Sequence, residues 1–226
     1  MVPDGARPGR WRGPGVGSVN VEGTTFFSVL AQLADADPDR PALTCGEVTL
    51  TRAGFVERVA RLAALFAGRG VVQGSTVVIG LPNSAELVES VFAAWAVGAV
   101  PLPVSGRLPP LERSASVDLA RPALVVGVPQ SEAGAWPALE SVPGQLPAGS
   151  FTPGVSPVWK LITSGGSTGR PKLIAATAPA LLENVRGLGA LTRIRPDGGG
   201  LVTGPSSHNA PFVVTAAGSN RDITTT

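Results

Sequence analysis

One segment of the sequence combines glycine, hydroxyl and lysine side chains in an order suited to binding phosphate. Residues Thr163 to Lys172 read Thr-Ser-Gly-Gly-Ser-Thr-Gly-Arg-Pro-Lys, at the end of the apolar run Val158–Thr163. Three glycines let the backbone approach a polyphosphate and turn its N–H groups inward, and four hydroxyl side chains add donors. Lys172 supplies a positive charge. The segment is therefore predicted to bind an anion.

Two better-known phosphate loops do not fit this segment. A Walker A loop needs a lysine directly after its last glycine and a hydroxyl residue after the lysine, whereas Arg170 and Pro171 separate Gly169 from Lys172. The nearest dinucleotide fingerprint, at residues 68–74, has the wrong glycine spacing. On the residues alone, a flexible turn stays open as the alternative, because glycine and serine are common in loops.

The only histidine, His208, begins the sequence His-Asn-Ala-Pro-Phe. Histidine changes charge near neutral pH and serves in many catalytic and binding sites. A single histidine in an arbitrary protein is nevertheless more often structural. His208 is therefore a candidate site residue whose structural interpretation stays open.

Composition indicates a globular protein and argues against two classes of partner. Of 226 residues, 43% are hydrophobic and 15% charged, which suits a packed core. The net charge of +2 comes without a dense basic stripe, so we expect no nucleic-acid partner. The longest apolar stretch, Val91–Val104, is shorter than the roughly 18 residues of a membrane span. A single cysteine, Cys45, excludes an internal disulfide and favours the cytoplasm.

Apolar periodicity predicts an α/β fold, in which strands alternate with helical crossovers. Trp95 and Trp159 lie in apolar runs and are expected to pack in the core instead of stacking on a ligand. Helices are expected at 25–37, 51–70, 84–98, 111–119 and 179–191, and strands at 42–45, 47–50, 77–81, 100–104, 124–126, 158–163 and 201–203.

Composition also suggests a division of the chain. We expect a loose extension at 1–22, a first α/β subdomain at 23–128, a Pro/Gly-rich connection at 129–157 with room for one short element, the start of a second α/β subdomain at 158–218, and an atypical tail at 219–226.

The complete ten-residue loop resembles the signature phosphate loop of the AMP-forming adenylate ligases, which include acyl-CoA synthetases, aryl acid-AMP ligases, peptide-synthetase adenylation domains and beetle luciferases. Other segments resemble that family in the same order: Pro38–Leu43, Thr49–Thr51, Leu81–Ser84 and Gly98–Val104. The resemblance runs from about Phe26 to Gly218. It implies part of the N-terminal domain of the family fold.

The resemblance implies a reaction and a set of site residues. In the family, a carboxylate attacks the α-phosphate of ATP, aided by Mg²⁺, and the acyl-adenylate is usually passed to a thiol such as CoA. His208 and Asn209 match a motif between the nucleotide and the carboxylate pocket. The Gly-Gly-Ser loop and the His-Asn pair resemble aryl acid ligases, whereas His-Asn-Ala-Pro-Phe also resembles acyl-CoA ligases, so the acid stays open. The family positions that hold the β- and γ-phosphates of ATP match Ser164, Gly165, Gly166, Ser167, Thr168, Gly169 and Lys172 in this sequence. Thr163, the first residue of the loop, is also predicted to bind the nucleotide.

Several functional segments of the family lie beyond the last matching position. These are the adenine-binding aromatic segment, the magnesium-binding glutamate, the ribose-binding aspartate, the hinge and the mobile C-terminal lysine. Neither lysine of this chain can be nominated as a substitute for the C-terminal lysine, because Lys160 and Lys172 both stand at or before the phosphate loop. The tail 219–226 also lacks the apolar helix and strand expected after the His-Asn motif. We therefore expect a truncated ligase that is inactive alone, with no metal ligand identified.

Two alternatives to the truncated ligase stay open. The chain could be a non-catalytic binder of ATP or polyphosphate, or the product of a gene fragment without a function of its own. In the second case, the apolar faces of 77–81, 100–104 and 161–163 should lack part of their cover, and the chain should self-associate through them.

Overall fold

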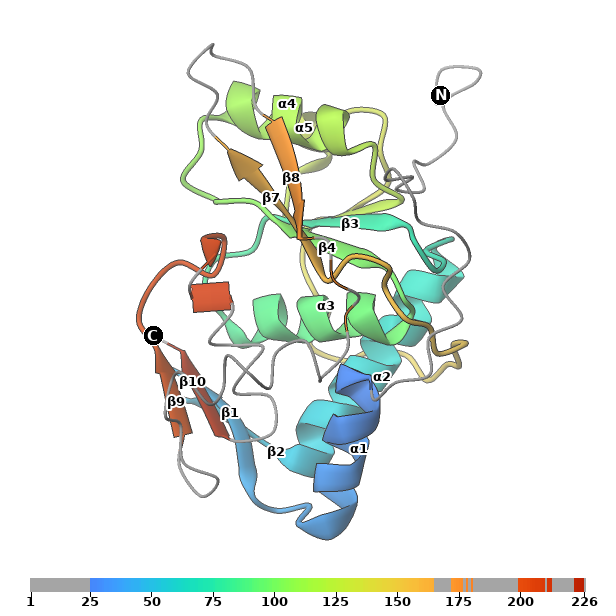
Figure 1. Ribbon diagram of the computed structural model, residues 1–226, viewed down its shortest axis with the longest axis vertical. Coiled ribbons are helices and arrows are strands. Elements are labelled where there is room, and N and C mark those ends of the chain that lie inside the picture. The colour runs from blue at the N-terminus through green and yellow to red at the C-terminus, as the bar shows by residue number, and fades with distance from the viewer. Residues whose placement is uncertain are drawn as a thin grey trace.

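Hydroxyl side chains begin the first three helices of the computed structural model (Figure 1). Helix α1 (Phe26–Ala36) follows Thr25, α2 (Arg52–Gly68) follows Thr51, and α3 (Ala85–Ala96) follows Ser84. Each of these hydroxyl oxygens accepts a hydrogen bond from the backbone N–H three residues later, which satisfies one free donor of the first turn. The predicted helices are confirmed at all three places. The structure describes residues 25–164, 172–176, 178, 180, 199–209, 211–212 and 222–225.

A four-stranded parallel sheet forms the centre of the molecule. Its strands are β3 (Thr76–Ile79), β4 (Val100–Pro103), β5 (Leu124–Val126) and β6 (Ala138–Leu139), in the order β4-β3-β5-β6. In Figure 1, α3 lies below this sheet, whereas α4 (Pro110–Ala120) and the short α5 (Gln130–Ala133) lie above it. Helices on both faces explain why every residue of β3 and β5 is buried.

A second sheet joins the two ends of the described chain. Its order is β2-β1-β10-β9, from β1 (Pro41–Cys45), β2 (Val48–Thr51), β9 (Gly199–Val202) and β10 (Asp222–Thr225). Strand β10 is parallel to both β1 and β9 and lies between them. The expectation that the tail 219–226 lacks a strand is therefore wrong. Its Ile-Thr-Thr-Thr sequence is rich in β-branched residues, which favour strands.

A β-hairpin carries the segment that sequence analysis singled out. Strand β7 (Lys160–Ser164) pairs antiparallel with β8 (Lys172–Ala176), and β7 lies beside β4. Strand β7 was predicted, whereas β8 was not, because its alternation of residues is too short to stand out. The helix predicted at 179–191 falls outside the described residues.

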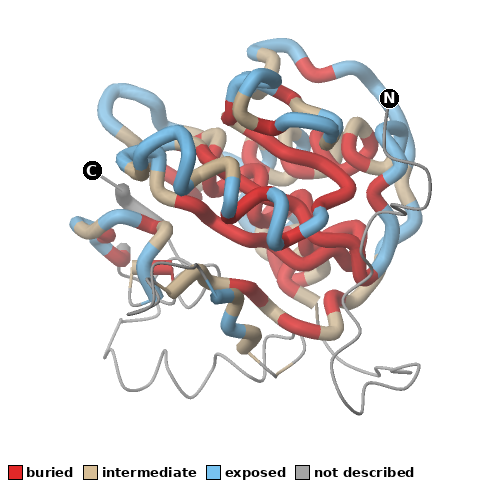
Figure 2. Tube along the Cα trace, turned by 90° about the horizontal axis from the view of Figure 1, so that it is seen from above, coloured by how far each residue is buried: buried red, intermediate tan, exposed pale blue. Residues whose placement is uncertain are grey.

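The core gathers around α3 and its aromatic neighbours. Figure 2 shows buried segments running through the middle of the molecule and exposed segments around its rim. Trp95 on α3 is 3% exposed and stacks on Phe26, with ring centroids 4.4 Å apart. Trp159 is partly buried against the same cluster. Both tryptophans thus have the packing role predicted for them.

Two of the three apolar segments expected to be uncovered are buried. The strand residues Val77, Ile79 and Val100 are 0% exposed, because helices cover β3 and β4 on both faces. The prediction that the apolar faces of these strands are exposed is wrong. These two strands therefore give no support to self-association through exposed apolar surface. Within the described ranges, no helix is long and apolar enough to cross a bilayer.

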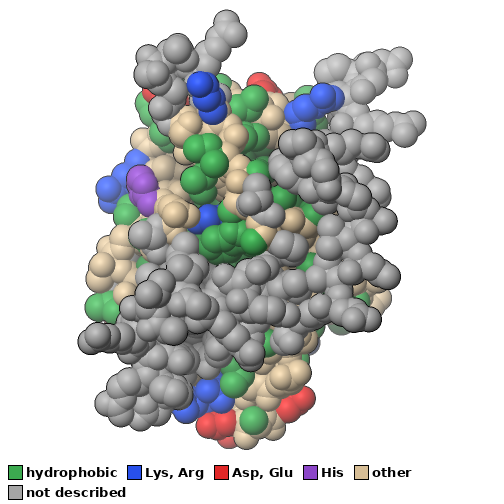
Figure 3. Space-filling model, viewed as in Figure 1, with side chains coloured by type: hydrophobic (Ala, Val, Ile, Leu, Met, Phe, Trp, Pro, Cys, Tyr) green, Lys and Arg blue, Asp and Glu red, His purple; other side chains and the backbone are tan. Residues whose placement is uncertain are grey.

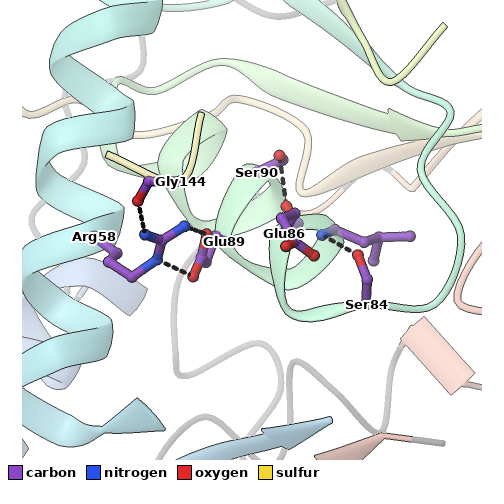
Figure 4. Close-up of polar contacts among 7 residues, drawn as sticks. Arg58, Ser84, Glu86, Glu89, Ser90 and Gly144 are labelled. Atoms are coloured by element: carbon purple, nitrogen blue, oxygen red, sulfur yellow. Dashed lines mark hydrogen bonds and ion pairs between the residues drawn. The ribbon is translucent and has the colours of Figure 1, made fainter. Parts of the chain in front are cut away.

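A buried ion pair ties α2 to α3 (Figure 4). Glu89 of α3 is 1% exposed, and its two carboxylate oxygens accept from Nε and Nη2 of Arg58 at 2.6 and 2.9 Å. The remaining Nη1 of Arg58 donates to the carbonyl of Gly144 at 2.9 Å. The same guanidinium therefore fixes both the helix pair and the long connection between β5 and β7.

Removing the charge of Arg58 should destabilise the fold far more than removing that of its neighbour Arg61. In Arg58→Met, Glu89 would be left buried without its guanidinium, and we expect a loss of about 3 kcal/mol in the free energy of unfolding. Arg61 pairs with the exposed Glu57 and donates to the Leu146 carbonyl at 3.0 Å, and its loss leaves no buried charge behind, so Arg61→Met should cost less, about 1 kcal/mol. Urea unfolding of the three proteins measures the difference. Equal losses would show that the Arg58–Glu89 pair has no special role.

Candidate functional site

The β7–β8 hairpin holds the two ends of the predicted phosphate loop side by side. In its register, Thr163 faces Leu173 and Ser164 faces Lys172. Directly opposed residues of an antiparallel pair lie about 5 Å apart, so the Ser164 hydroxyl and the exposed Lys172 belong to one local site. The predicted site residues Gly165, Gly166, Ser167, Thr168 and Gly169 fall outside the described residues.

The second predicted element, His208-Asn209, lies in a turn that follows β9. The His208 N–H donates to the Pro205 carbonyl at 2.9 Å, and the His208 carbonyl accepts from the Phe212 N–H at 3.3 Å. The first contact closes a turn, and the second spans four residues as in a helix. Both His208 and Asn209 are exposed, whereas Phe212 is buried and anchors the segment.

Asn83 attaches this turn to the loop that precedes α3. Its Nδ2 donates to the Gly204 carbonyl at 2.9 Å, and its Oδ1 accepts from the Ser206 N–H at 2.9 Å. One carboxamide thus satisfies both a donor and an acceptor of a segment more than 120 residues away in the sequence. The helix cap itself is the neighbouring Ser84. Sequence analysis noted the Leu-Pro-Asn-Ser segment but missed this role, because nothing local signals a distant partner.

A buried lysine connects the hairpin to the His208 turn. Lys160, the first residue of β7, is 1% exposed, and its ammonium donates to the side-chain oxygen of Asn209. Burial lowers the pKa of Lys160 to about 8, because the charged form loses hydration. The structure therefore brings Asn209 next to the strand that carries the predicted phosphate loop.

A cavity of about 790 Å³ opens where the parallel strands end. Its walls come from the residues that follow β3, β4 and β5, closed on one side by the turn after β9. In the order β4-β3-β5-β6, the connection from β3 leads to β4 on one side and the connection from β5 leads to β6 on the other, and such a switch point between adjacent strands is where open α/β sheets bind ligands. Residues lining the cavity include Gly80, Asn83, Gly106, Arg107, Gly127 and Ser207.

Glycines keep the cavity's inner wall close-packed. A Cβ added at Gly80 would lie 2.4 Å from Val128 Cγ2, and one at Gly127 would lie 2.5 Å from the Leu81 side chain. Gly127 also has a φ of +73°, which other residues rarely adopt. Larger residues at either position would push the loops after β3 and β5 apart. The predicted site residues Thr163, Ser164, Lys172, His208 and Asn209 do not line this cavity in the described part of the chain, although Ser207 does.

Arginine side chains make this cavity suitable for an anion. Arg113 is neutralised by Glu132, with Nε to Oε2 at 2.6 Å, and the Arg113 hydrogen bond lowers the pKa of Glu132. Arg107 is exposed, and no ion pair with a described carboxylate offsets its charge. Figure 3 shows acidic side chains at the lower end of the view and others at its upper end. The end of α1 and the turn that follows it carry three exposed acids, Asp35, Asp37 and Asp39.

The described residues do not supply a magnesium site. Within those ranges, no three His, Cys, Asp or Glu side chains stand close enough together to hold a metal ion. The magnesium implied by the family resemblance therefore has no identified ligand set among the described residues.

Comparisons with known proteins agree with the resemblance. A family model described as AMP-binding enzyme matches residues 30–219. Pseudomonine synthase PmsE of Pseudomonas entomophila is 30% identical over 219 residues, which cover 84% of this chain and 36% of the relative. The salicyl-AMP ligase/salicyl-S-ArCP synthetase of Mycobacterium tuberculosis is 29% identical over 224 residues, covering 84% of this chain and 40% of the relative. The chain thus spans little more than a third of the length of these relatives.

Solved structures show the same fold. The o-succinylbenzoate CoA synthetase of Bacillus subtilis, solved with its acyl-adenylate intermediate, superposes with a TM-score of 0.72 at 20% identity, covering 88% of this chain and 55% of that one. The N-terminal subdomain of Klebsiella oxytoca NpsA superposes with a TM-score of 0.70 at 21% identity, covering 90% and 54%.

Replacing Asn83 should release the turn that carries His208. In Asn83→Ala the Ser206 N–H loses its acceptor, so its hydrogen exchange should accelerate at least about tenfold, as expected for loss of a roughly 1.4 kcal/mol contact. Asn83→Asp keeps an acceptor oxygen and should preserve that protection while losing the bond to Gly204. Exchange measured by NMR would refute this role of Asn83 if Ser206 behaved alike in both variants.

The stability of the chain should depend on pH through Lys160. Its pKa falls from 10.5 to about 8 on folding, so between these values the unfolded state holds more protons. The free energy of unfolding should therefore rise with pH across this window, relative to Lys160→Met, by at most about 1.4 kcal/mol per pH unit. Denaturant unfolding at several pH values measures the two slopes. Parallel slopes would mean that Lys160 is not desolvated.

Proposed function

Since the chain belongs to the AMP-binding enzyme family of adenylate-forming ligases, we propose that it provides the phosphate-binding part of an enzyme that activates a carboxylic acid with ATP. The observation that carries this proposal is the register of the hairpin, in which Ser164 and Lys172 face each other at the two ends of the glycine-rich segment. The hairpin holds Ser164 and Lys172 in place, so these two residues need not be ordered when a phosphate binds.

The residues of the hairpin would act on the leaving group. When a carboxylate oxygen attacks the α-phosphorus of ATP, the bond to pyrophosphate breaks and negative charge builds up on the leaving oxygens. Lys172 and the backbone N–H groups of the loop would stabilise that charge. Magnesium, when bound, would neutralise part of the same charge. The proposed phosphate contacts are Thr163, Ser164, Gly165, Gly166, Ser167, Thr168, Gly169 and Lys172.

The acid is proposed to bind near His208 and Asn209. The salicyl-AMP ligase among the relatives favours an aryl acid, and the Gly-Gly-Ser loop and the His-Asn pair support the same class. A thiol, either CoA or a carrier-bound thiol, is the proposed acceptor of the acyl group. The cavity beside Arg107 has the size and charge for part of such a ligand.

A second candidate function is the binding of polyphosphate without catalysis. The observation in its favour is that the chain spans 36% and 40% of two relatives, so the adenine and ribose contacts of the family would lie outside the matched part. Exchange of labelled pyrophosphate into ATP, with magnesium and a panel of aryl acids, separates the two functions. Acid-dependent exchange supports the ligase, whereas triphosphate binding without exchange supports the binder.

Lys172 should be required for phosphate binding through its charge. Lys172→Ala should weaken the binding of inorganic triphosphate about tenfold or more, whereas Lys172→Arg should retain most of it. Calorimetry at low ionic strength measures the affinities, because exposed charges are less screened there. Adenosine should bind more weakly than triphosphate. If all three proteins bound triphosphate equally, the loop would not be the phosphate site.

A further inference from the structure

Lys160 is a buried cation without a described counter-charge. Its side chain is among the largest that are under 2% exposed, and no ion pair to a described carboxylate involves it. Burying an ammonium group costs free energy unless polar contacts replace its water shell. A methionine of similar length would fill the same space without this cost. The free-energy cost of burying this ammonium group suggests that its charge has a function that a methionine could not supply.

The surroundings of Lys160 hold its ammonium at one point. Nζ lies 4.7 Å from the ring centroid of Trp159 and 4.6 Å from that of Phe212, so two aromatic faces stabilise the charge. Trp159 is itself fixed, because its carbonyl accepts from Trp95 Nε1 at 2.7 Å. The polar contacts of the ammonium both go to Asn209, through the side-chain oxygen and through the backbone oxygen at 3.4 Å.

This contact determines which way the Asn209 carboxamide faces. An ammonium group only donates hydrogen bonds, so the oxygen of the carboxamide must face Lys160 and the NH₂ group must face away. Asn209 is exposed, and no described residue is seen to accept from its Nδ2. The NH₂ group is thus available as a donor to a ligand.

We propose that Lys160 is a positioning residue that fixes Asn209 as a hydrogen-bond donor, so that the site prefers acids offering an acceptor at this point over acids offering a donor. The inference rests on the proposed function, in which Asn209 borders the acid. A ligand donor facing the fixed NH₂ group would leave two donors opposed across the contact, so the affinity should fall about tenfold.

The contact itself can be tested without any ligand. The chain has two lysines, so a sample labelled with ¹³C at lysine Cε gives one signal for Lys160 and one for Lys172. In Asn209→Asp a carboxylate replaces the carboxamide, and the titration midpoint of Lys160 should rise well above about 8. Asn209→Ser, which adds no charge, is the matched control. A midpoint that Asn209→Asp leaves unchanged would overturn the proposal.

The selectivity can be tested with salicylate and anthranilate, which differ only in the group beside the carboxylate. In salicylate the hydroxyl hydrogen points to the carboxylate, so the hydroxyl oxygen offers an acceptor to the protein. In anthranilate one N–H points to the carboxylate and the other N–H offers a donor to the protein. The full chain should bind salicylate about tenfold more tightly. Lys160→Met should reduce this preference to less than about threefold, whereas Lys160→Gln, which still carries a donor, should retain more of it.

The outcomes separate this proposal from the proposed function. Equal preference for salicylate in the wild type and in Lys160→Met would overturn the role of Lys160, even if both proteins bind acid. If the wild type bound neither acid while Asn209→Asp still raised the Lys160 titration midpoint, the contact would stand, and both the acid site and its selectivity would be refuted.

Discussion

The Arg58–Glu89 ion pair is the constraint on which the arrangement of this chain depends. Glu89 lies on α3, whose residues contact the parallel sheet on one side and β1 of the second sheet on the other. A carboxylate at 1% exposure is tolerated there only with a matched partner, and the bidentate geometry of Arg58 supplies one. Because Arg58, Arg61 and Arg69 also bind carbonyls of residues 138–146, helix α2 fixes the connection that leads from β6 toward β7. The position of the hairpin follows from this framework.

The site depends on contacts between segments far apart in the sequence. Lys160 and Asn209 join the hairpin to the turn after β9, and Asn83 joins that turn to the loop before α3. These two links place the His208 turn between the cavity at the end of the parallel sheet and the strand that leads into the predicted phosphate loop. Positive charge is supplied by Arg107 at the cavity and by the exposed Lys172 at the hairpin. Geometry and charge thus agree with an anionic ligand.

Local sequence was enough to predict most helices and three of the four strands of the parallel sheet, because apolar periodicity and hydroxyl caps are local signals. The helix beginning at Thr51 and the buried strand at Val77 are examples. The expectation of one short element at 129–157 was wrong, since both α5 and the two-residue strand β6 lie there. Strand β10 could not be predicted, since its partner β1 lies about 180 residues earlier and the tail 219–226, with Ile223 as its one apolar residue, has no apolar pattern. The role of Lys160 could not be predicted, because its partner Asn209 is 49 residues away in the sequence and only the fold brings the two together. The phosphate loop stays a prediction from residue types, whereas the facing of Ser164 and Lys172 comes from the strand register.

The central claim is that the segment between β7 and β8, and not the cavity beside Arg107, is the phosphate-binding element of this chain. Titrating the ¹⁵N-labelled chain with inorganic triphosphate and following the backbone amides by NMR tests it directly. The account predicts that the largest saturable shifts fall on the amides from Ser164 to Lys172, with smaller ones at Ser207 to Asn209. Shifts concentrated instead at Gly80, Gly106 and Gly127, or no saturable shift at all, would contradict it.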